Sequence, residues 1–206
     1  AGYAAVKEGY TKLGYLGGME VPAVQRYGFG YVQGINAAAE ELGKDVEIKY
    51  TYGGQFNGDA NITAKMEGWY ADGTEVVFAC GGGIYTSAVE AANQYNGKVI
   101  GVDVDQSSID PCIITSATKG LYSATYSALD TYFTGKWDTV GGTLANLSLA
   151  QGDYVGLPTD TWSMKNFTVD EYNKLVEDIK NGTVQISDSI DAMPEVGSHV
   201  TLTKID

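Results

Sequence analysis

The chain has 206 residues, of which 44% are hydrophobic and 19% charged, which is enough to bury the core of one domain or two small ones. Its 13 Lys and Arg residues against 26 Asp and Glu residues give a formal net charge of -13. This charge argues against a nucleic-acid partner, because phosphate backbones are bound by basic faces. An anionic membrane surface would repel it too, and no run approaches the roughly 18 to 20 apolar residues of a membrane span.

Short apolar runs that end in glycine or aspartate alternate with stretches of helical period, a pattern typical of βα units around a parallel sheet. The predicted strands cover residues 12–16, 46–52, 75–80, 98–102 and 112–116. Helices are predicted over residues 23–42, 61–71 and 86–95, and another follows the last of these strands, from Leu121 to near Gly135. The sequence therefore predicts an α/β fold with a mainly parallel sheet.

Beyond Trp137 the pattern is less regular. Residues 142–150 are expected to form another strand, and residues 169–180 an amphipathic helix closed by Asn181 and Gly182. The last segment, 187–206, has no clear period and is expected to be partly extended. No internal repeat and no linker rich in Pro, Gly or Ser marks a domain boundary.

Candidate ligand-binding segments follow the predicted strands. Ligands of open α/β sheets bind beyond the carboxyl ends of the strands, where loops and helix N-termini converge. Glycines there let the backbone approach a ligand closely, an aromatic ring offers a surface for stacking, and carboxylates accept hydrogen bonds from hydroxyl groups. Together these features predict a site for a neutral, flat, hydroxylated small molecule. The segments are Gly17-Gly18-Met19-Glu20, Gly53-Gly54-Gln55-Phe56-Asn57, Gly81-Gly82-Gly83, Asp103-Val104-Asp105-Gln106 and Lys119.

Each segment also has an ordinary structural interpretation. Glycines at strand ends commonly form tight turns, and Phe56 would equally suit the core. Asp103 or Asp105 would cap a following helix, and Asp105 is better placed to do so because it lies further into the loop. Lys119 alone is typical of a surface lysine. The coincidence of these residues on one sheet edge favours the ligand-binding interpretation.

Signals of catalysis are few. The sequence has no Gly-x-Ser-x-Gly elbow, and its only histidine, His199, lies outside the regular βα region. Cys80 ends one predicted strand and Cys112 begins another, so in a parallel sheet they are expected at opposite edges and unbonded. With no Cys/His cluster, the sequence predicts no catalytic residue, no metal site and no cofactor.

One segment is compatible with an oxidoreductase that uses a dinucleotide. Gly81-Gly82-Gly83-Ile84-Tyr85-Thr86 follows a predicted strand, and Asp103 ends the next strand. Thr86, however, stands where the dinucleotide fingerprint has Gly or Ala, which disfavours this interpretation.

The strand-end segments resemble those of the basic membrane protein family, bacterial substrate-binding lipoproteins of the purine nucleoside receptor type that serve ABC transporters. The matching blocks occur in the family order and at family-like spacing from about Ala1 to Leu157. They are Leu13-Gly14-Tyr15-Leu16-Gly17-Gly18-Met19-Glu20-Val21-Pro22, Tyr52-Gly53-Gly54-Gln55-Phe56-Asn57, Ala79-Cys80-Gly81-Gly82-Gly83, Ile100-Gly101-Val102-Asp103-Val104-Asp105-Gln106 and Thr115-Ser116-Ala117-Thr118-Lys119.

The resemblance implies a type I periplasmic-binding-protein fold, in which two α/β lobes close around a ligand. Residues 1–206 would then form the C-terminal ligand-binding lobe, with a doubly wound, mainly parallel, Rossmann-like sheet. The first lobe would be largely missing. Residues 1–10 and 121–135 are expected to cross to it.

The resemblance also implies roles for individual residues. Phe56 matches the aromatic residue that stacks on the nucleobase, and Gly82, beside Gly81, matches a backbone contact of the glycine loop. Asp103 matches the acidic residue that accepts hydrogen bonds from ribose hydroxyls, and Lys119 the lysine that reaches the ribose. The predicted ligand-binding residues are Phe56, Gly81, Gly82, Asp103, Asp105 and Lys119.

The function implied is that of a solute-binding protein, not an enzyme, which binds a nucleoside of the purine type and delivers it to the permease of an ABC transporter. The protein would work outside the cytoplasm, at the cell surface or in the periplasm, held to the membrane only by an N-terminal lipid anchor that this chain does not contain. The alternatives are a sensory or regulatory domain of the same fold and a sugar-binding protein. A lipobox cysteine or a DNA-binding segment at the N-terminus would distinguish the transport protein from the regulator.

Overall fold

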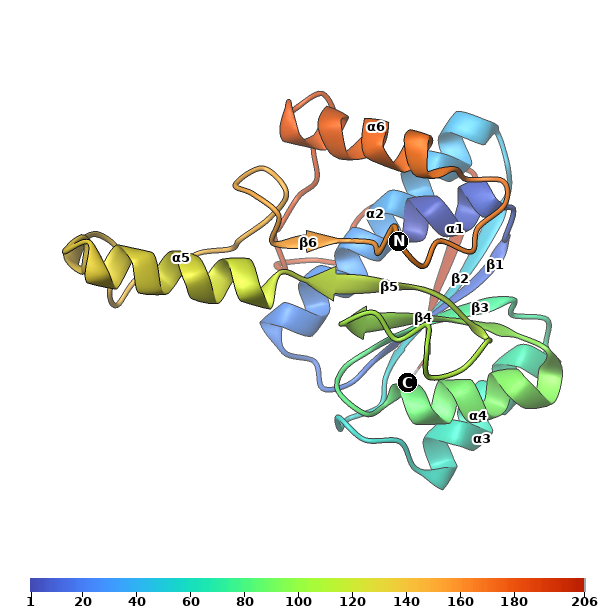
Figure 1. Cartoon of the computed structure of the whole chain (residues 1–206). Coiled ribbons are helices and arrows are strands. Elements are labelled where there is room, and N and C mark those ends of the chain that lie inside the picture. Colours follow the sequence, from blue (N-terminus) through green and yellow to red (C-terminus); the bar gives the residue numbers. More distant parts are fainter. Residues whose placement is uncertain (206) are drawn as a thin grey trace.

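The computed structural model describes residues 1–205, which form a seven-stranded sheet with helices on both faces (Figure 1). The order across the sheet is β6-β5-β4-β3-β1-β2-β7, and every neighbouring pair is parallel except β5 and β6. The predicted α/β class and the doubly wound, mainly parallel sheet are confirmed. The strands are β1 (Lys12–Gly17), β2 (Val46–Tyr52), β3 (Val76–Cys80), β4 (Lys98–Asp103), β5 (Ile113–Lys119), β6 (Val155–Gly156) and β7 (Val200–Lys204).

The helices divide between the two faces of the sheet. α1 (Gly2–Glu8) and α2 (Pro22–Leu42) cover one face, with α6 (Val169–Lys180) packed outside them (Figure 1). α3 (Ala60–Ala71) and α4 (Tyr85–Tyr95) cover the other face. Because both faces are covered, the central strand β3 is apolar and buried along its whole length, as is usual for strands inside a parallel sheet.

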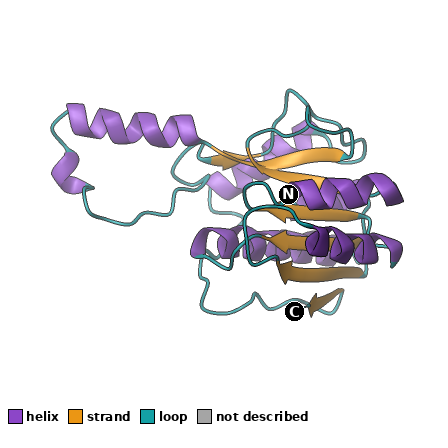
Figure 2. Cartoon of the chain, turned by 90° about the horizontal axis from the view of Figure 1, so that it is seen from below, coloured by secondary structure: helices purple, strands orange, loops and turns teal. Residues whose placement is uncertain are grey.

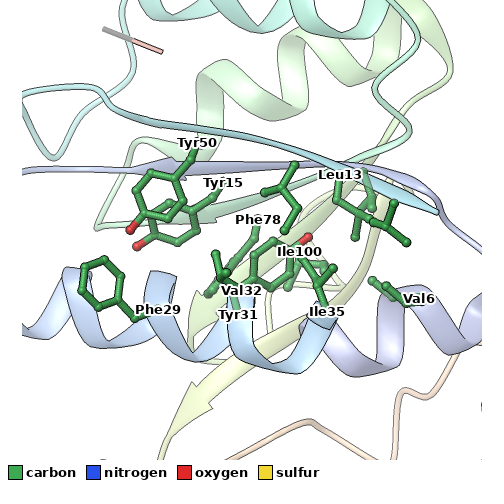
Figure 3. Close-up of a cluster of buried hydrophobic side chains, with 14 of the residues drawn as sticks. Val6, Leu13, Tyr15, Phe29, Tyr31, Val32, Ile35, Tyr50, Phe78 and Ile100 are labelled. Carbon is green, nitrogen blue, oxygen red and sulfur yellow. The ribbon is translucent and has the colours of Figure 1, made fainter. Parts of the chain in front are cut away.

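An aromatic cluster fills the space between the sheet and α2 (Figure 3). The rings of Tyr15 and Tyr50, on neighbouring strands, stack with centroids 4.5 Å apart, and the edge of Phe78 lies 5.5 Å from Tyr15. All three side chains are fully buried. This packing fixes α2 firmly on the sheet beside the carboxyl edge.

Sequence signals at the helix ends set the helix bounds. Asp59 caps α3 by accepting hydrogen bonds from the backbone N–H groups of Asn61 and Ile62. Thr168 and Glu171 form a reciprocal capping box at the start of α6. Gly43 and Gly182 adopt positive φ where α2 and α6 end, as expected for helix stops.

Two expectations for individual elements are wrong. Residues 142–150 form turns and irregular structure instead of a strand, and Leu144 is 91% exposed. The place beside β5 is taken by β6, which pairs with it through Val155 and Gly156. In the described structure no helix separates β4 from β5, so Asp103 and Asp105 cap none; a turn segment lies there.

The remaining expectations outside the site are confirmed where the structure describes them. The last segment contributes an extended element, β7, which pairs with β2 at the sheet edge; Asp206 lies outside the described residues. Cys80 and Cys112 are both free and buried. No helix in the described part of the chain is long and apolar enough to cross a membrane.

Residues 121–152 leave the body of the molecule and return to it at nearly the same point (Figures 1 and 2). They contain α5 (Leu121–Phe133) and the 3-10 helix η1 (Trp137–Thr139), neither of which has a buried residue. At the base, the backbone N–H of Gly120 donates to the carbonyl of Tyr154 at 2.7 Å. The helix is confirmed, and its crossing to another lobe stays a prediction.

The same holds for residues 1–10. Their helix, α1, packs on α2, and Ala4, Ala5 and Val6 are buried within this lobe. A crossing through this segment stays a prediction.

Candidate functional site

The predicted site residues lie at the carboxyl edge of the sheet, where the direction of the chain connections changes. β1 lies between β2 and β3. The connection after β1 leads to α2 on one face, whereas the connection after β3 leads to α4 on the other. The loops that follow β1 and β3 therefore diverge. This makes a topological switch point, which is the place where open α/β sheets bind ligands.

Backbone hydrogen bonds join the glycine loops at this switch point. The N–H of Gly18 donates to the carbonyl of Cys80 at 2.9 Å, and the N–H of Gly53 donates to that of Gly17 at 2.8 Å. The N–H of Gly83 donates to the carbonyl of Phe56 at 2.7 Å. The loops after β1, β2 and β3 thus form one connected surface.

The Phe56 ring rests on these glycines. A Cβ atom at Gly18 would lie 2.5 Å from ring atom Cδ1, and one at Gly81 would lie 3.1 Å from the same atom. Gly81 and Gly82 also have φ values of +149° and +53°, which side chains disfavour. Phe56 is 38% exposed, so part of the ring stays accessible for stacking while the glycines support the rest.

Asp103 and Lys119 form an ion pair on the neighbouring strands β4 and β5. Asp103 is paired in register with Thr118, which places Lys119 one residue beyond it. Lys119 Nζ lies 2.7 Å from Asp103 Oδ1, and each side chain is 37% exposed. Asp103 has a φ of +69°, a conformation that residues other than glycine seldom adopt and that is frequent at functional sites.

Two side chains line the base of this ion pair. The ring of Tyr27, from α2, has its centroid 5.2 Å from Lys119 Nζ. Cys80 is buried nearby, and this burial raises the pKa of its thiol to about 12. At neutral pH the thiol therefore stays protonated and is not an activated nucleophile.

Asp105 occupies different surroundings from Asp103. Its Oδ1 accepts a hydrogen bond from the backbone N–H of Ser107 at 3.0 Å, and its Oδ2 accepts one from the hydroxyl of Thr161 at 2.7 Å. Partial burial alone would raise the pKa of Asp105, but these hydrogen bonds outweigh it and lower the pKa. Both oxygens thus accept hydrogen bonds from within the protein, and a role of Asp105 in ligand binding stays a prediction.

The contributions of Tyr27 and Gln106 were not predicted from the sequence. Tyr27 lies in the helix predicted over residues 23–42, and its contact with Lys119 joins segments 92 residues apart in the chain (119 minus 27). Gln106 is buried, and its Oε1 accepts from the backbone N–H of Val102 at 2.9 Å, which fixes the turn after Asp103. Gln106 belongs to the candidate segment Asp103-Val104-Asp105-Gln106, but nothing in the sequence indicated this hydrogen bond.

The site is an open edge of the molecule. A cavity of about 460 Å³ lies between α3 and α4, and another of about 560 Å³ lies between α1, α2 and α6. Neither is lined by Phe56, Gly81, Gly82, Asp103 or Lys119. Among the described residues no group of His, Cys, Asp and Glu side chains is arranged to hold a metal ion.

Sequence comparison identifies relatives over most of the chain. Basic membrane protein A2 of Borrelia garinii subsp. bavariensis is 35% identical over 73% of this chain and 44% of its own length. The ABC transporter nucleoside-binding protein BmpA of Lactococcus lactis subsp. cremoris is 28% identical over 90% of this chain and 56% of its own length. The chain thus spans about half the length of the curated relatives it matches.

Solved structures of similar fold include a transport protein and a transcriptional activator. An ABC transporter solute-binding protein from Aeropyrum pernix K1 has a TM-score of 0.70 at 21% identity, over 92% of this chain and 65% of that one. A transcriptional activator of the comK gene from Bacillus halodurans has a TM-score of 0.66 at 18% identity, over 94% of this chain and 62% of that one. At these identities the likeness shows the fold alone.

The family model of PnrA-like ABC transporter substrate-binding proteins, named Bmp, matches residues 1–189. This match covers the candidate site, from the glycine loops to the Asp103–Lys119 pair, and residues 121–152 with α5. The chain therefore belongs to the PnrA-like family of ABC transporter substrate-binding proteins.

Proposed function

We propose that this chain is the C-terminal lobe of a two-lobed protein that binds a purine nucleoside between its lobes. The observation that carries the proposal is the Asp103–Lys119 ion pair, which stands half-exposed at an open sheet edge. The name of the Lactococcus relative, a nucleoside-binding protein, supports the ligand class. The length of the relatives, about twice that of the aligned chain, supports a second lobe.

The ion pair suits the vicinal hydroxyls of a ribose. Each hydroxyl can both donate and accept a hydrogen bond, whereas a carboxylate only accepts and an ammonium only donates. A ribose placed beside Asp103 and Lys119 would donate to the carboxylate and accept from the ammonium, and bonds to charged groups are stronger than neutral ones. A sugar with two adjacent hydroxyls therefore matches this pair better than an apolar or anionic ligand does.

The nucleobase would stack on Phe56. Its ring is supported from below by Gly18 and Gly81, so its position is fixed before the ligand binds. Stacking on an aromatic ring favours a flat base, and the loop around Gly82 offers backbone groups to the base edge. In this arrangement a second lobe would cover the other side of the base, and closure would bury the ligand.

The partner and the location follow from the same proposal. Substrate-binding proteins of ABC importers deliver their ligand to a membrane permease outside the cytoplasm, and we assign this role to the whole protein. A lipid anchor on its N-terminal part would keep it at the membrane. No chemical conversion of the ligand is required, in agreement with a protonated, buried Cys80 at the site.

Calorimetric titration of the full-length protein with purine nucleosides tests the site. Asp103→Ala and Phe56→Ala should each weaken binding by about 1 to 3 kcal/mol, the range for an unmet polar contact or a lost stacking ring. Asp72→Ala, which breaks an ion pair with Lys49 at the entry to β3, and Tyr95→Ala, which removes an exposed ring on α4, are matched controls that should bind normally. Unchanged affinity in both site variants would contradict the assignment.

A further inference from the structure

The Lys119 side chain is held by two contacts, only one of which is ionic. Lysine carries a flexible four-carbon stem, and fixing it costs conformational entropy. Asp103 Oδ1 lies 2.7 Å from the ammonium, and the Tyr27 ring centroid lies 5.2 Å from it. The distance to the ring is within the range of a cation–π interaction, which attracts an ammonium to the face of a tyrosine ring.

The Tyr27 ring is itself held by the fold. It lies on α2, packs against the core cluster, and its centroid is 6.4 Å from that of Phe78. Its hydroxyl oxygen is buried and has no hydrogen-bond partner among the described residues. Burial raises the pKa of Tyr27 above the ordinary tyrosine value, so the phenol stays neutral and does not pair with Lys119 as an anion. The part of Tyr27 that serves the site is therefore its ring and not its hydroxyl.

We infer that Tyr27 is a positioning residue for the ribose-binding pair: its ring holds the Lys119 ammonium beside Asp103 before the ligand arrives. The inference rests on the nucleoside-binding function proposed above and adds a determinant of its preference for a hydroxylated sugar. The ring is a surface without hydrogen-bonding capacity, so it leaves the N–H groups of the ammonium available to Asp103 and to a ribose oxygen. Without the ring, the ammonium would sample orientations that point into solvent.

Two substitutions separate the ring from the hydroxyl. Tyr27→Phe keeps the ring and removes the unpaired hydroxyl, whereas Tyr27→Leu removes the ring. The matched control is Tyr3→Leu, because Tyr3 lies on α1 against Phe167 and also has a lysine, Lys7, above its ring at 5.8 Å. Any general effect of replacing a packed tyrosine under a lysine should appear in the control as well.

The first measurement is the preference of the full-length protein for inosine over its dideoxy analogue, which lacks the vicinal ribose hydroxyls. Tyr27→Leu should weaken inosine binding roughly three- to tenfold and leave binding of the analogue unchanged. Tyr27→Phe and Tyr3→Leu should keep the preference of the unmodified protein. Because the readout is a ratio of two affinities, a loss of stability alone would not change it.

The second measurement needs no ligand. Isotope-labelled lysine reports ring proximity by NMR through its Cε methylene group, and the Lys119 signal should be displaced by the Tyr27 ring in the unmodified protein and in Tyr27→Phe, but not in Tyr27→Leu. An unchanged preference for inosine in Tyr27→Leu, or a Lys119 signal that is the same in Tyr27→Leu as in the unmodified protein, would overturn the inference. Either result would leave the proposed function intact. A protein with no nucleoside binding at all would overturn the proposed function, and this inference with it.

Discussion

Asp103 combines backbone strain and charge at one position of the sheet edge. Its φ of +69° costs on the order of 1 to 3 kcal/mol for a residue with a side chain. That conformation ends β4 and turns the chain, while the carboxylate stays paired with Lys119. Under the proposed function, this strained conformation would be retained because it places the carboxylate for binding to ribose hydroxyls.

The strand-end position of Asp103 and Lys119 was readable from the sequence, because a strand of alternating or continuous apolar residues is a local pattern. The contact of Lys119 with Tyr27 was not, since it depends on how α2 crosses the sheet. The sequence distinguishes Asp105 from Asp103 only as the better candidate for a helix cap, whereas in the fold hydrogen bonds from Ser107 and Thr161 hold Asp105 apart.

Buried hydroxyls in the tyrosine-rich core have opposite effects on stability. Tyr31 is buried with an unpaired hydroxyl, whereas the hydroxyl of Tyr15 donates to the carbonyl of Val24 at 2.6 Å. Tyr31→Phe should therefore raise the free energy of unfolding by about 1 kcal/mol, and Tyr15→Phe should lower it by about the same amount. Urea unfolding of the two variants measures both changes. A destabilised Tyr31→Phe variant would show that the hydroxyl has a partner in solution.

At the level of elements, the central strands and their helices were predictable and the outer strands were not. β1 to β5 and α2 to α4 carry their own apolar period and stop signals, so their bounds agree with the sequence within a few residues. β6 is formed by Val155 and Gly156 alone and exists because the edge of β5 is available. The prediction of a strand over 142–150 is wrong because most of its apolar residues, such as Leu144, are exposed and none pairs with a neighbouring strand.

The exposure of α5 has no explanation within the lobe itself, because none of its residues is buried there. Its large apolar side chains are exposed, among them Tyr122 at 82% and Phe133 at 79%. Exposed apolar surface of this extent is typical of an interface. The chain leaves and re-enters the lobe at Gly120 and Tyr154, beside Lys119, so the base of this surface lies next to the candidate site.

Hydrogen exchange tests whether a second lobe covers α5. In the isolated 206-residue chain, the amides of α5 should exchange much faster than those of the buried helix α2, since α5 has no buried residue. In the full-length protein, α5 should become protected while α2 stays as it was. Equal protection of α5 in the two proteins would contradict a lobe that packs on this helix.

At the scale of the whole molecule, the features fit half of a binding site. The sheet edge carries a supported ring and an ion pair, the cavities described above do not include them, and the helix α5 with its exposed apolar side chains projects from the same edge. The fold class followed from the alternation of apolar runs and helical stretches, which is a property of the entire sequence. The ligand did not, because under the proposed function its recognition would depend on surfaces that two lobes share.

The central claim is that the protein binds a purine nucleoside through Asp103, Lys119 and Phe56. Native mass spectrometry of the gently purified full-length protein, with identification of any bound small molecule, tests it most directly. The account predicts the mass of a purine nucleoside on the unmodified protein and a lower occupancy of that nucleoside on Asp103→Ala. A bound sugar or dinucleotide, or no complex after a nucleoside soak, would contradict the account.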